Sequence, residues 1–559
     1  MRKSMMKIGW GVMKAGLIGG ISLLLIGCGM VPEPEEDPLD AFCAHVYPEG
    51  NPGAVVLVRK GAEILLRKGY GMADLETGAP MKSDSVFQIA SNTKAFTATA
   101  VMMLVEEGRI SLDSSLNEYL LDYPDYGREI TIRQLLNHTS GIKNYVSMPE
   151  YDVNMRMRAL AIGEMVNLFK NQPRDFPPGK SWRYNNSAYI LLSAVIEKAS
   201  GLRYLDFLHQ RIFLPLGMRF SRGFSREQVI PFRISGYEIN GKDIYRPPYE
   251  NIVQNWGAGA LLSTAGDIDI FYRALENGSL ISRESYAFLT TDSGFNQGRP
   301  LECGSGFWLS DFRGFRVIEN EGYMRGFTTR IFSIPEEGIF IAVFTNSSGR
   351  EKPDDPRYVA QWIAARLLGQ PYPDWRFSEQ SLEVLKSHEG VYRIDEKTTR
   401  SVSVGRKGLF TMRTDSRRME ALPGSESKFF YPGTFTYLSF EKDDSGRIVK
   451  MTVHSPERNE VAVKTDLPLR RPLAVDAVVL DRFTGTYDFG RFTWKLFQEE
   501  GRLFVDDGRR RRELFAEAEN VFFPEDEDSH WTFVSSNQGE VVSLELRFGS
   551  RTWTARKVK

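Results

Sequence analysis

The chain has 559 residues, of which 42% are hydrophobic and 26% charged, and a formal net charge of -1 with a pI near 6.7. This length predicts two or three domains of ordinary globular composition. The near-zero net charge gives no general electrostatic reason to bind nucleic acid, so we set that class of function aside.

The first 28 residues have the pattern of an export signal, with basic residues before an apolar run over residues 15–27 that ends at Cys28. A small residue followed by cysteine resembles the lipobox of bacterial lipoproteins, in which the cysteine becomes the lipidated N-terminus. We expect Cys28 to anchor the protein in a lipid bilayer, on the periplasmic face of the outer membrane, because Gly29 replaces the aspartate that often causes inner-membrane retention. An uncleaved anchor is the alternative, but the run is short against the roughly 20 residues of a spanning helix.

Residues 29–44 are expected to form a solvated tether, because their first part is rich in proline and acidic residues. The first folded domain is predicted over residues 45–370. If Cys28 is lipidated, only Cys43 and Cys303 remain. An exported protein could join them in a disulfide, although two free buried thiols are the interpretation we favour.

Residues 54–66 predict a β-hairpin, and residues 87–108 predict one buried helix that ends at a glycine. Ser91 falls in the first turn of this helix and Lys94 three residues later, so both side chains project from one face. A desolvated amine can act as the base for a serine nucleophile. Taken alone, the pair favours an ordinary helix start with a solvated lysine, because the same spacing recurs at residues 4–7 and 425–428.

A short helix closed by a turn is predicted within residues 130–142, and we interpret His138 there as a structural residue. Prolines and a glycine at 177–179 then force a loop before a helix that ends at Gly201. Tyr184 and Asn186 lie at this loop-to-helix junction, where catalytic groups are common. The alternative is a capping asparagine beside a half-buried tyrosine.

Later elements predict how this domain closes. Residues 256–267 indicate a glycine-rich turn and a helix cap, and residues 319–346 a hairpin with its turn at Pro335–Gly338. Asp355 then opens a helix that Gly369 closes. Strands at both ends with helices between them predict an α+β domain whose terminal strands share an antiparallel sheet.

The rest of the chain consists of short alternating runs and contains one segment twice, over residues 380–466 and 474–559. Gly390-Val-Tyr392 matches Gly485-Thr-Tyr487, and other pairs follow at a nearly constant offset. Two small antiparallel β-barrels or sandwiches are the simplest interpretation. The basic run 509–512 and the acidic run 525–528 are expected to be solvated or to compensate each other.

The order of these motifs resembles the serine β-lactamase and penicillin-binding superfamily, especially its class C-like branch of esterases and D-aminopeptidases. The resemblance implies a β-lactamase/transpeptidase-like domain, with an antiparallel sheet, flanking helices and a helical subdomain, and it covers residues 45 to about 370. The two repeats are similar to the paired lipocalin-like barrels of bacterial D-aminopeptidases. The motifs are SNTK at 91–94, LLNHTSG at 135–141, PPG at 177–179, YNN at 184–186, PLGM at 215–218 and GALLSTAGD at 259–267.

Carried over by position, the resemblance implies that Ser91 is the acylated nucleophile and that Lys94 and Tyr184 handle its proton. Asn186 would contact the substrate amide and the lysine.

The third family motif aligns with Asn320-Glu321-Gly322, so the usual cationic or titratable side chain is missing. Asn320, Gly322 and Tyr323 are the remaining expected substrate-binding residues, with the Tyr323 N-H and the Ser91 N-H holding the oxyanion. The missing cation puts the usual contact with a substrate carboxylate in doubt. This favours an esterase or amidase over an efficient β-lactamase or carboxypeptidase.

The expected function is therefore a cell-envelope serine hydrolase that acts on a small-molecule ester, amide or peptide. No cofactor is expected, and no cluster with recognisable metal-ligand spacing occurs in the sequence. The alternative is a binding or sensing protein that acylates once without turnover, which the asparagine at position 320 motivates.

Overall fold

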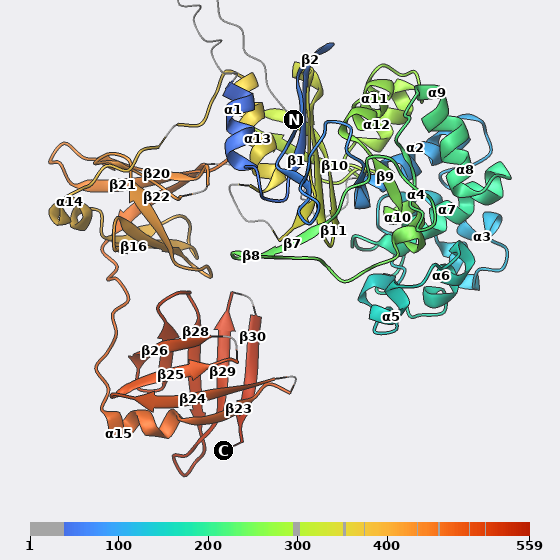
Figure 1. Cartoon of the computed structure of the whole chain (residues 1–559). Coiled ribbons are helices and arrows are strands. Elements are labelled where there is room, and N and C mark those ends of the chain that lie inside the picture. Colours follow the sequence, from blue (N-terminus) through green and yellow to red (C-terminus); the bar gives the residue numbers. More distant parts are fainter. Residues whose placement is uncertain are drawn as a thin grey trace, which may run out of the picture.

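The computed structural model describes residues 38–293, 302–349, 354–373, 375–432, 434–456, 459–490, 492–508, 510–549 and 551–558. The predicted export signal and Cys28 lie outside these residues. Figure 1 shows a domain of helices built on one sheet, followed by two β-barrels. The predicted fold class, α+β followed by two small antiparallel barrels, is confirmed. Over the same described residues, no helix is both long and apolar enough to cross a bilayer.

The first domain is organised by a six-stranded antiparallel sheet that joins the two ends of the domain, as predicted. The strands in spatial order are β10 (Trp308–Phe312), β11 (Phe315–Met324), β12 (Phe327–Ile334), β13 (Ile339–Thr345), β1 (Ala54–Lys60) and β2 (Glu63–Tyr70). Both predicted hairpins are present, and the turn at Pro335–Gly338 joins β12 to β13. Along β1, Val55 and Leu57 face one apolar core while Val56 and Val58 face another.

The larger core lies between this sheet and a group of helices. They are α2 (Thr93–Glu106), α3 (Leu116–Tyr119), α4 (Ile132–Leu136), α5 (Val153–Arg156), α6 (Ile162–Phe169), α7 (Asn186–Ser200), α8 (Tyr204–Leu208), α9 (Leu214–Leu216), α10 (Trp256–Gly259), α11 (Ala265–Glu276) and α12 (Arg283–Leu289). Helix α2 is buried over nearly its whole length and packs against α7 and α10. Gly108 follows α2 with a φ of 69°, so it closes this helix as predicted.

Short strands connect the sheet to the helices. They are β3 (Met72–Asp74) with β4 (Ala79–Pro80), β5 (Phe87–Gln88) with β9 (Leu261–Ser263) and β6 (Arg222–Gly223), and β14 (Ser347–Ser348) with β7 (Tyr237–Asn240) and β8 (Asp243–Tyr245). The pairing of β5 with β9 holds the residues just before Ser91 against the segment that follows α10.

Helices α1 (Pro38–Val46) and α13 (Pro356–Leu367) cover the opposite face of the sheet (Figure 1). The predicted tether over residues 29–44 is therefore wrong from residue 38 onward. Leu39 and Cys43 recur at helical spacing and are buried beside α13, a pattern that the neighbouring acidic residues and prolines concealed. Cys43 and Cys303 are both buried and are not joined in a disulfide, as we favoured.

Each C-terminal repeat forms a closed eight-stranded barrel preceded by a short helix. The first contains α14 (Leu382–Ser387), β15 (Gly390–Arg393), β16 (Thr399–Val404), β17 (Leu409–Arg413), β18 (Met419–Pro423), β19 (Lys428–Phe430), β20 (Tyr437–Lys442), β21 (Ile448–His454) and β22 (Asn459–Thr465). The second contains α15 (Ala477–Leu480), β23 (Gly485–Asp488), β24 (Thr493–Glu499), β25 (Arg502–Asp506), β26 (Arg511–Ala518), β27 (Val521–Pro524), β28 (His530–Ser535), β29 (Val541–Phe548) and β30 (Arg551–Lys557).

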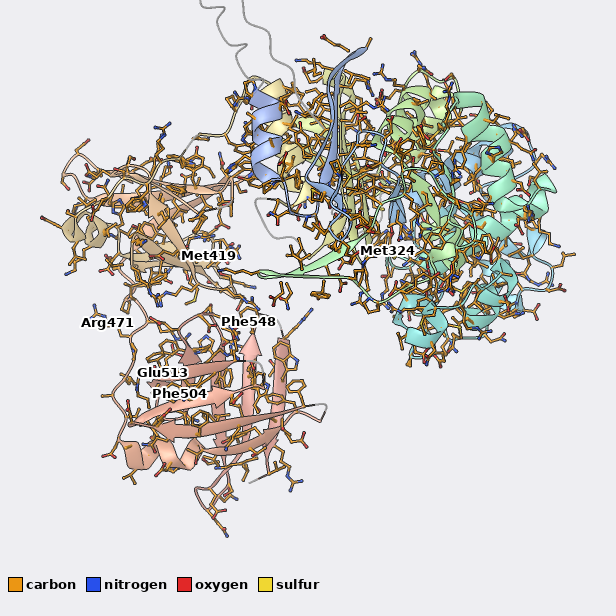
Figure 2. The ribbon with its side chains drawn as sticks, in the orientation of Figure 1. Met324, Met419, Arg471, Phe504, Glu513 and Phe548 are labelled. Carbon is orange, nitrogen blue, oxygen red and sulfur yellow. The ribbon has the colours of Figure 1, made fainter. Side chains whose placement is uncertain are left out.

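The same local hydrogen bond occurs at the first strand of both barrels, which confirms the repeat. The Tyr392 hydroxyl donates to the backbone carbonyl of His388 at 2.7 Å, and the Tyr487 hydroxyl donates to that of Phe483 at 2.9 Å. Figure 2 places Arg471 on the segment that links the two barrels.

The charged runs of the second barrel compensate each other, one of the two predicted arrangements. Arg510 pairs with Asp526 at 2.8 Å and Arg512 with Glu527 at 3.2 Å.

Candidate active site

Ser91 lies on a 3-10 turn, η1 (Ala90–Asn92), just before α2. The predicted helix over residues 87–108 therefore begins later than expected, because residues 87–88 pair into a sheet as β5. Ala90 has a φ of 46°, a left-handed conformation that is uncommon for a residue with a side chain. The left-handed conformation of Ala90 turns the chain sharply. Ser91 follows on this turn and lines the wall of a cavity.

The Lys94 ammonium nitrogen is surrounded by three oxygen atoms. It lies 3.2 Å from the Ser91 hydroxyl oxygen, 2.8 Å from Oδ1 of Asn186 and 2.7 Å from the backbone carbonyl oxygen of Ala258. The amide and carbonyl oxygens can only accept hydrogen bonds. In a neutral amine they would take both N-H groups, so the nitrogen lone pair would face Ser91.

Tyr184 approaches Ser91 from the loop before α7, and its hydroxyl donates to the Ser91 oxygen at 2.8 Å. The capping asparagine of this helix is Asn185, whose side chain accepts from the Ala188 N-H. Asn186 is therefore the first helical residue and is available to Lys94. The structure brings all three expected catalytic side chains and Asn186 together.

Burial sets the protonation of these groups. It lowers the pKa of Lys94 well below its ordinary value, because the ammonium form loses its hydration. Burial also raises the pKa of Tyr184 above its usual range, although the hydrogen bond with Ser91 opposes the shift. The amine is thus the group prepared to accept a proton, while the phenol keeps its own.

His138 has the structural role that we expected. Its Nδ1 accepts a hydrogen bond from the Asn185 N-H at 3.2 Å. Burial lowers the pKa of His138 to about 3, so the ring stays neutral at physiological pH.

The strand that carries the third motif uses its asparagine within the fold. The Asn320 side chain is buried, donates to the carbonyl of Gly306 at 2.8 Å and accepts from the Tyr272 hydroxyl at 3.2 Å. Both ends of its amide are therefore occupied, although Asn320 still contributes to the cavity wall. Tyr323 is 58% exposed on the same strand.

Gly322 allows strand β11 to lie close to another part of the protein, and not only to a substrate. A Cβ at this position would overlap the Ile89 carbonyl oxygen and the Thr329 hydroxyl. Only glycine therefore lets β11 lie directly against the turn that carries Ser91.

The substitution Gly322→Ala should consequently displace β11 from this turn. We expect the free energy of unfolding to fall by roughly 1–3 kcal/mol, as in other overpacked cores, and ester hydrolysis to fall more than tenfold. Gly163→Ala on α6 is the matched control, because a Cβ there meets no atom within 4 Å. Urea unfolding and ester kinetics measure both effects; equal behaviour of the two variants would contradict this role of Gly322.

Sequence reasoning missed the charge of the cavity. The cavity has a volume of about 10 Å³, roughly the space of one water molecule, and its wall includes Glu321 and Trp308. Burial lowers the pKa of both Lys94 and His138, and Glu321 is the one carboxylate among the described residues that line the cavity. Its carboxylate lies 2.7 Å from Arg330, which also pairs with Glu319, so one guanidinium faces two carboxylates.

Comparison with known proteins identifies the family. A protein-family model described as Beta-lactamase matches residues 40–366, which are more than half of the chain. The chain belongs to this family. The beginning of the match at residue 40 agrees with helix α1 being part of the first domain.

Two relatives of this family support hydrolase chemistry at the family level. Penicillin-binding protein 4* of Bacillus subtilis is 29% identical over 402 residues, which cover 67% of this chain and 87% of that protein. The structure of a D-stereospecific amidohydrolase from Streptomyces sp. is 26% identical, covers 59% of this chain and 98% of its own, and gives a TM-score of 0.50.

A third match shows the fold alone. The octameric penicillin-binding protein homologue from Pyrococcus abyssi is 24% identical, with a TM-score of 0.53 over 76% of this chain and 99% of its own. A β-lactamase family domain with a helical subdomain and a sheet therefore fits both the sequence and the structure.

Proposed function

We propose that this protein is a cell-envelope serine hydrolase that cleaves an ester or a peptide-like amide through an acyl-enzyme on Ser91. The observation that carries the proposal is the position of the Lys94 amine, 3.2 Å from the Ser91 oxygen with two acceptors occupying its other sides.

The proposed reaction has two stages. Lys94 accepts the Ser91 proton, directly or through Tyr184, as the serine oxygen bonds to the substrate carbonyl carbon. The N-H groups of Ser91 and Tyr323 would hold the resulting oxyanion, an effect worth on the order of 3 kcal/mol for each donor. The proton then passes to the leaving alcohol or amine, and water releases the acyl group.

Steady-state kinetics with a short-chain p-nitrophenyl ester test this proposal. Continued release of nitrophenol over many equivalents supports a hydrolase. One stoichiometric burst would instead support a binding or sensing protein that acylates once, a function favoured by the small cavity and by the engaged amide of Asn320. No release and no labelling of Ser91 by a fluorophosphonate would contradict both functions.

The location in the cell envelope is part of the same proposal and rests on the sequence. The apolar run before Cys28 has the form of a lipoprotein signal. A lipid on Cys28 would hold the hydrolase at a bilayer, and the acidic segment that follows would keep it in solvent.

Glu321 is expected to disfavour substrates with an anionic group close to the reacting carbonyl, because its carboxylate shares the cavity of Ser91 and Tyr184. The variant Glu321→Gln removes this repulsion and should raise kcat/KM for an anionic β-lactam such as nitrocefin about tenfold. Hydrolysis of neutral p-nitrophenyl acetate should change much less. Glu337→Gln, on the exposed turn between β12 and β13, is the control; a similar gain in that variant, or none in Glu321→Gln, would contradict the expectation.

A further inference from the structure

A hollow of about 490 Å³ lies at the end of β11. Its wall includes Gln88, three residues before Ser91, and Met324, which directly follows Tyr323. Both the turn with the proposed nucleophile and the strand with the proposed oxyanion donor therefore continue into it. A substrate held at Ser91 that extended along the end of β11 would meet this hollow.

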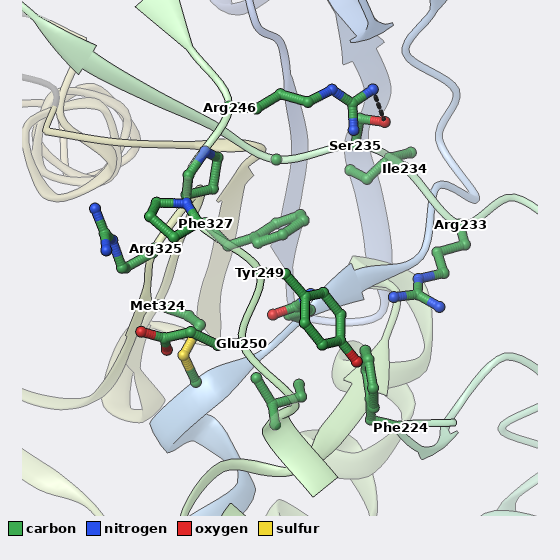
Figure 3. Close-up of a pocket in the computed structure, with 15 residues that line it drawn as sticks. Phe224, Arg233, Ile234, Ser235, Arg246, Tyr249, Glu250, Met324, Arg325 and Phe327 are labelled. Carbon is green, nitrogen blue, oxygen red and sulfur yellow. Dashed lines mark hydrogen bonds between the residues drawn. The ribbon is translucent and has the colours of Figure 1, made fainter. Parts of the chain in front are cut away.

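Two distant parts of the chain form the remaining walls. Figure 3 shows Met324 and Arg325 on one side of the hollow and Phe224 and Arg233 on the other, with Tyr249 between them. Phe224 and Met324 also belong to one apolar cluster beneath the hollow. Its size falls within the range of about 300–1,000 Å³ that is usual for small-molecule sites.

The charges around the hollow do not cancel. Three of its four charged side chains are neutralised by residues outside its wall. The pairs are Arg246 with Glu76, Arg325 with Glu238 at 2.8 Å, and Glu250 with Arg156 at 3.2 Å. Arg233 is the fourth.

Arg233 makes weaker contacts. Its guanidinium donates to the Ser225 carbonyl at 3.3 Å and lies 4.7 Å from the centre of the Phe224 ring. Within the described part of the chain, no carboxylate oxygen comes within 4 Å of it. Arg233 is an exposed residue, and local desolvation lowers the pKa of its guanidinium below the ordinary value.

We propose that this hollow is a substrate subsite and that Arg233 binds a carboxylate on the distal part of the substrate. The proposal rests on the hydrolase function above and names its substrate class: esters or amides with an acidic group several bonds from the reacting carbonyl. The uncompensated positive charge of Arg233 matches the negative charge of one carboxylate, and the planar guanidinium can bind both carboxylate oxygens. The apolar rings of the wall would cover the intervening carbon chain.

Three p-nitrophenyl esters of equal length test the subsite: the monoester of suberic acid, the ester of octanoic acid and the ester of ω-amino-octanoic acid. The wild-type protein should hydrolyse the suberate ester with a kcat/KM about tenfold above that of the octanoate ester, and the ammonium ester more slowly than either. Arg233→Met should bring the suberate-to-octanoate ratio close to one. Arg233→Glu should reverse the order in favour of the ammonium ester.

Arg226→Met is the matched control, because this exposed arginine lies 5.3 Å from the Tyr249 ring but does not line the hollow. It should keep the wild-type preference. No preference for suberate in the wild type, or the same preference in Arg233→Met, would overturn the subsite. Thermal unfolding of each variant checks that it is folded.

A binding measurement separates this proposal from the proposed reaction. Suberate titrated calorimetrically into Ser91→Ala should bind, and the added Arg233→Met substitution should weaken that binding about tenfold. If none of the esters is hydrolysed but suberate binds through Arg233, the hydrolase proposal fails and the anion site stands. If esters are hydrolysed but suberate binding does not depend on Arg233, the site proposal fails alone.

Discussion

Replacing Ser91 with alanine is expected to lower kcat/KM for p-nitrophenyl acetate by about 10⁴-fold or more, because burial raises the pKa of Cys303, a thiol in the cavity wall, to about 12 and so disfavours the thiolate that would replace the serine. The free energy of unfolding should change by no more than about 1 kcal/mol, since the half-buried hydroxyl only contacts Tyr184 and Lys94. Purified variants compared by ester kinetics and urea unfolding give both values.

The chain supplies its own control for this variant. Ser425 begins another serine-x-x-lysine sequence, in a turn of the first barrel where its hydroxyl accepts from the Lys428 N-H. Ser425→Ala should retain full hydrolysis. Loss of activity in both variants, or in neither, would show that the activity does not depend on the Ser91 turn.

Replacing Lys94 with methionine should have the second largest effect, a loss of about 10³–10⁴-fold in acylation, because the base for the serine proton is removed. Tyr184→Phe should cost less, about 10²-fold, because Tyr184 keeps its proton and acts as a relay. Pre-steady-state kinetics of nitrophenol release measure both. A greater loss in Tyr184→Phe than in Lys94→Met would make the phenol, rather than the amine, the principal base.

The pH dependence follows from the same groups. Acylation requires neutral Lys94, whose pKa is lowered by burial, so the rate should fall as the pH drops through that lowered pKa. His138, with a pKa of about 3, should contribute no step near neutral pH. The profile of kcat/KM for a neutral ester should therefore show one acidic limb that His138→Asn leaves in place; loss of that limb would contradict the assignment to Lys94.

Much of this site could be predicted from the sequence because the motifs occur in a specific order. Ser91 and Lys94 were ambiguous alone, and the later tyrosine and asparagine made the interpretation specific. The terminal hairpins also carry strong local signals. The geometry that connects Ser91 to Tyr184 at 2.8 Å, however, depends on packing between α2 and α7 and has no local signal.

Other features could not be predicted for identifiable physical reasons. The turn at Ala90 was missed because the apolar residues from 87 onward already match a helix, and only the pairing of β5 with β9 prevents it. Helix α1 was missed because its buried positions, such as Leu39, are mixed with acidic residues.

The most direct test of the account is to locate the acyl group. The protein is mixed with a slowly hydrolysed ester, quenched in acid within milliseconds and digested, and the peptides are analysed by mass spectrometry. We expect the mass of the acyl group on the peptide that contains Ser91, in wild type and not in Ser91→Ala. Acylation of another residue, or turnover of the ester with Ser91 unmodified throughout, would contradict the proposed acyl-enzyme.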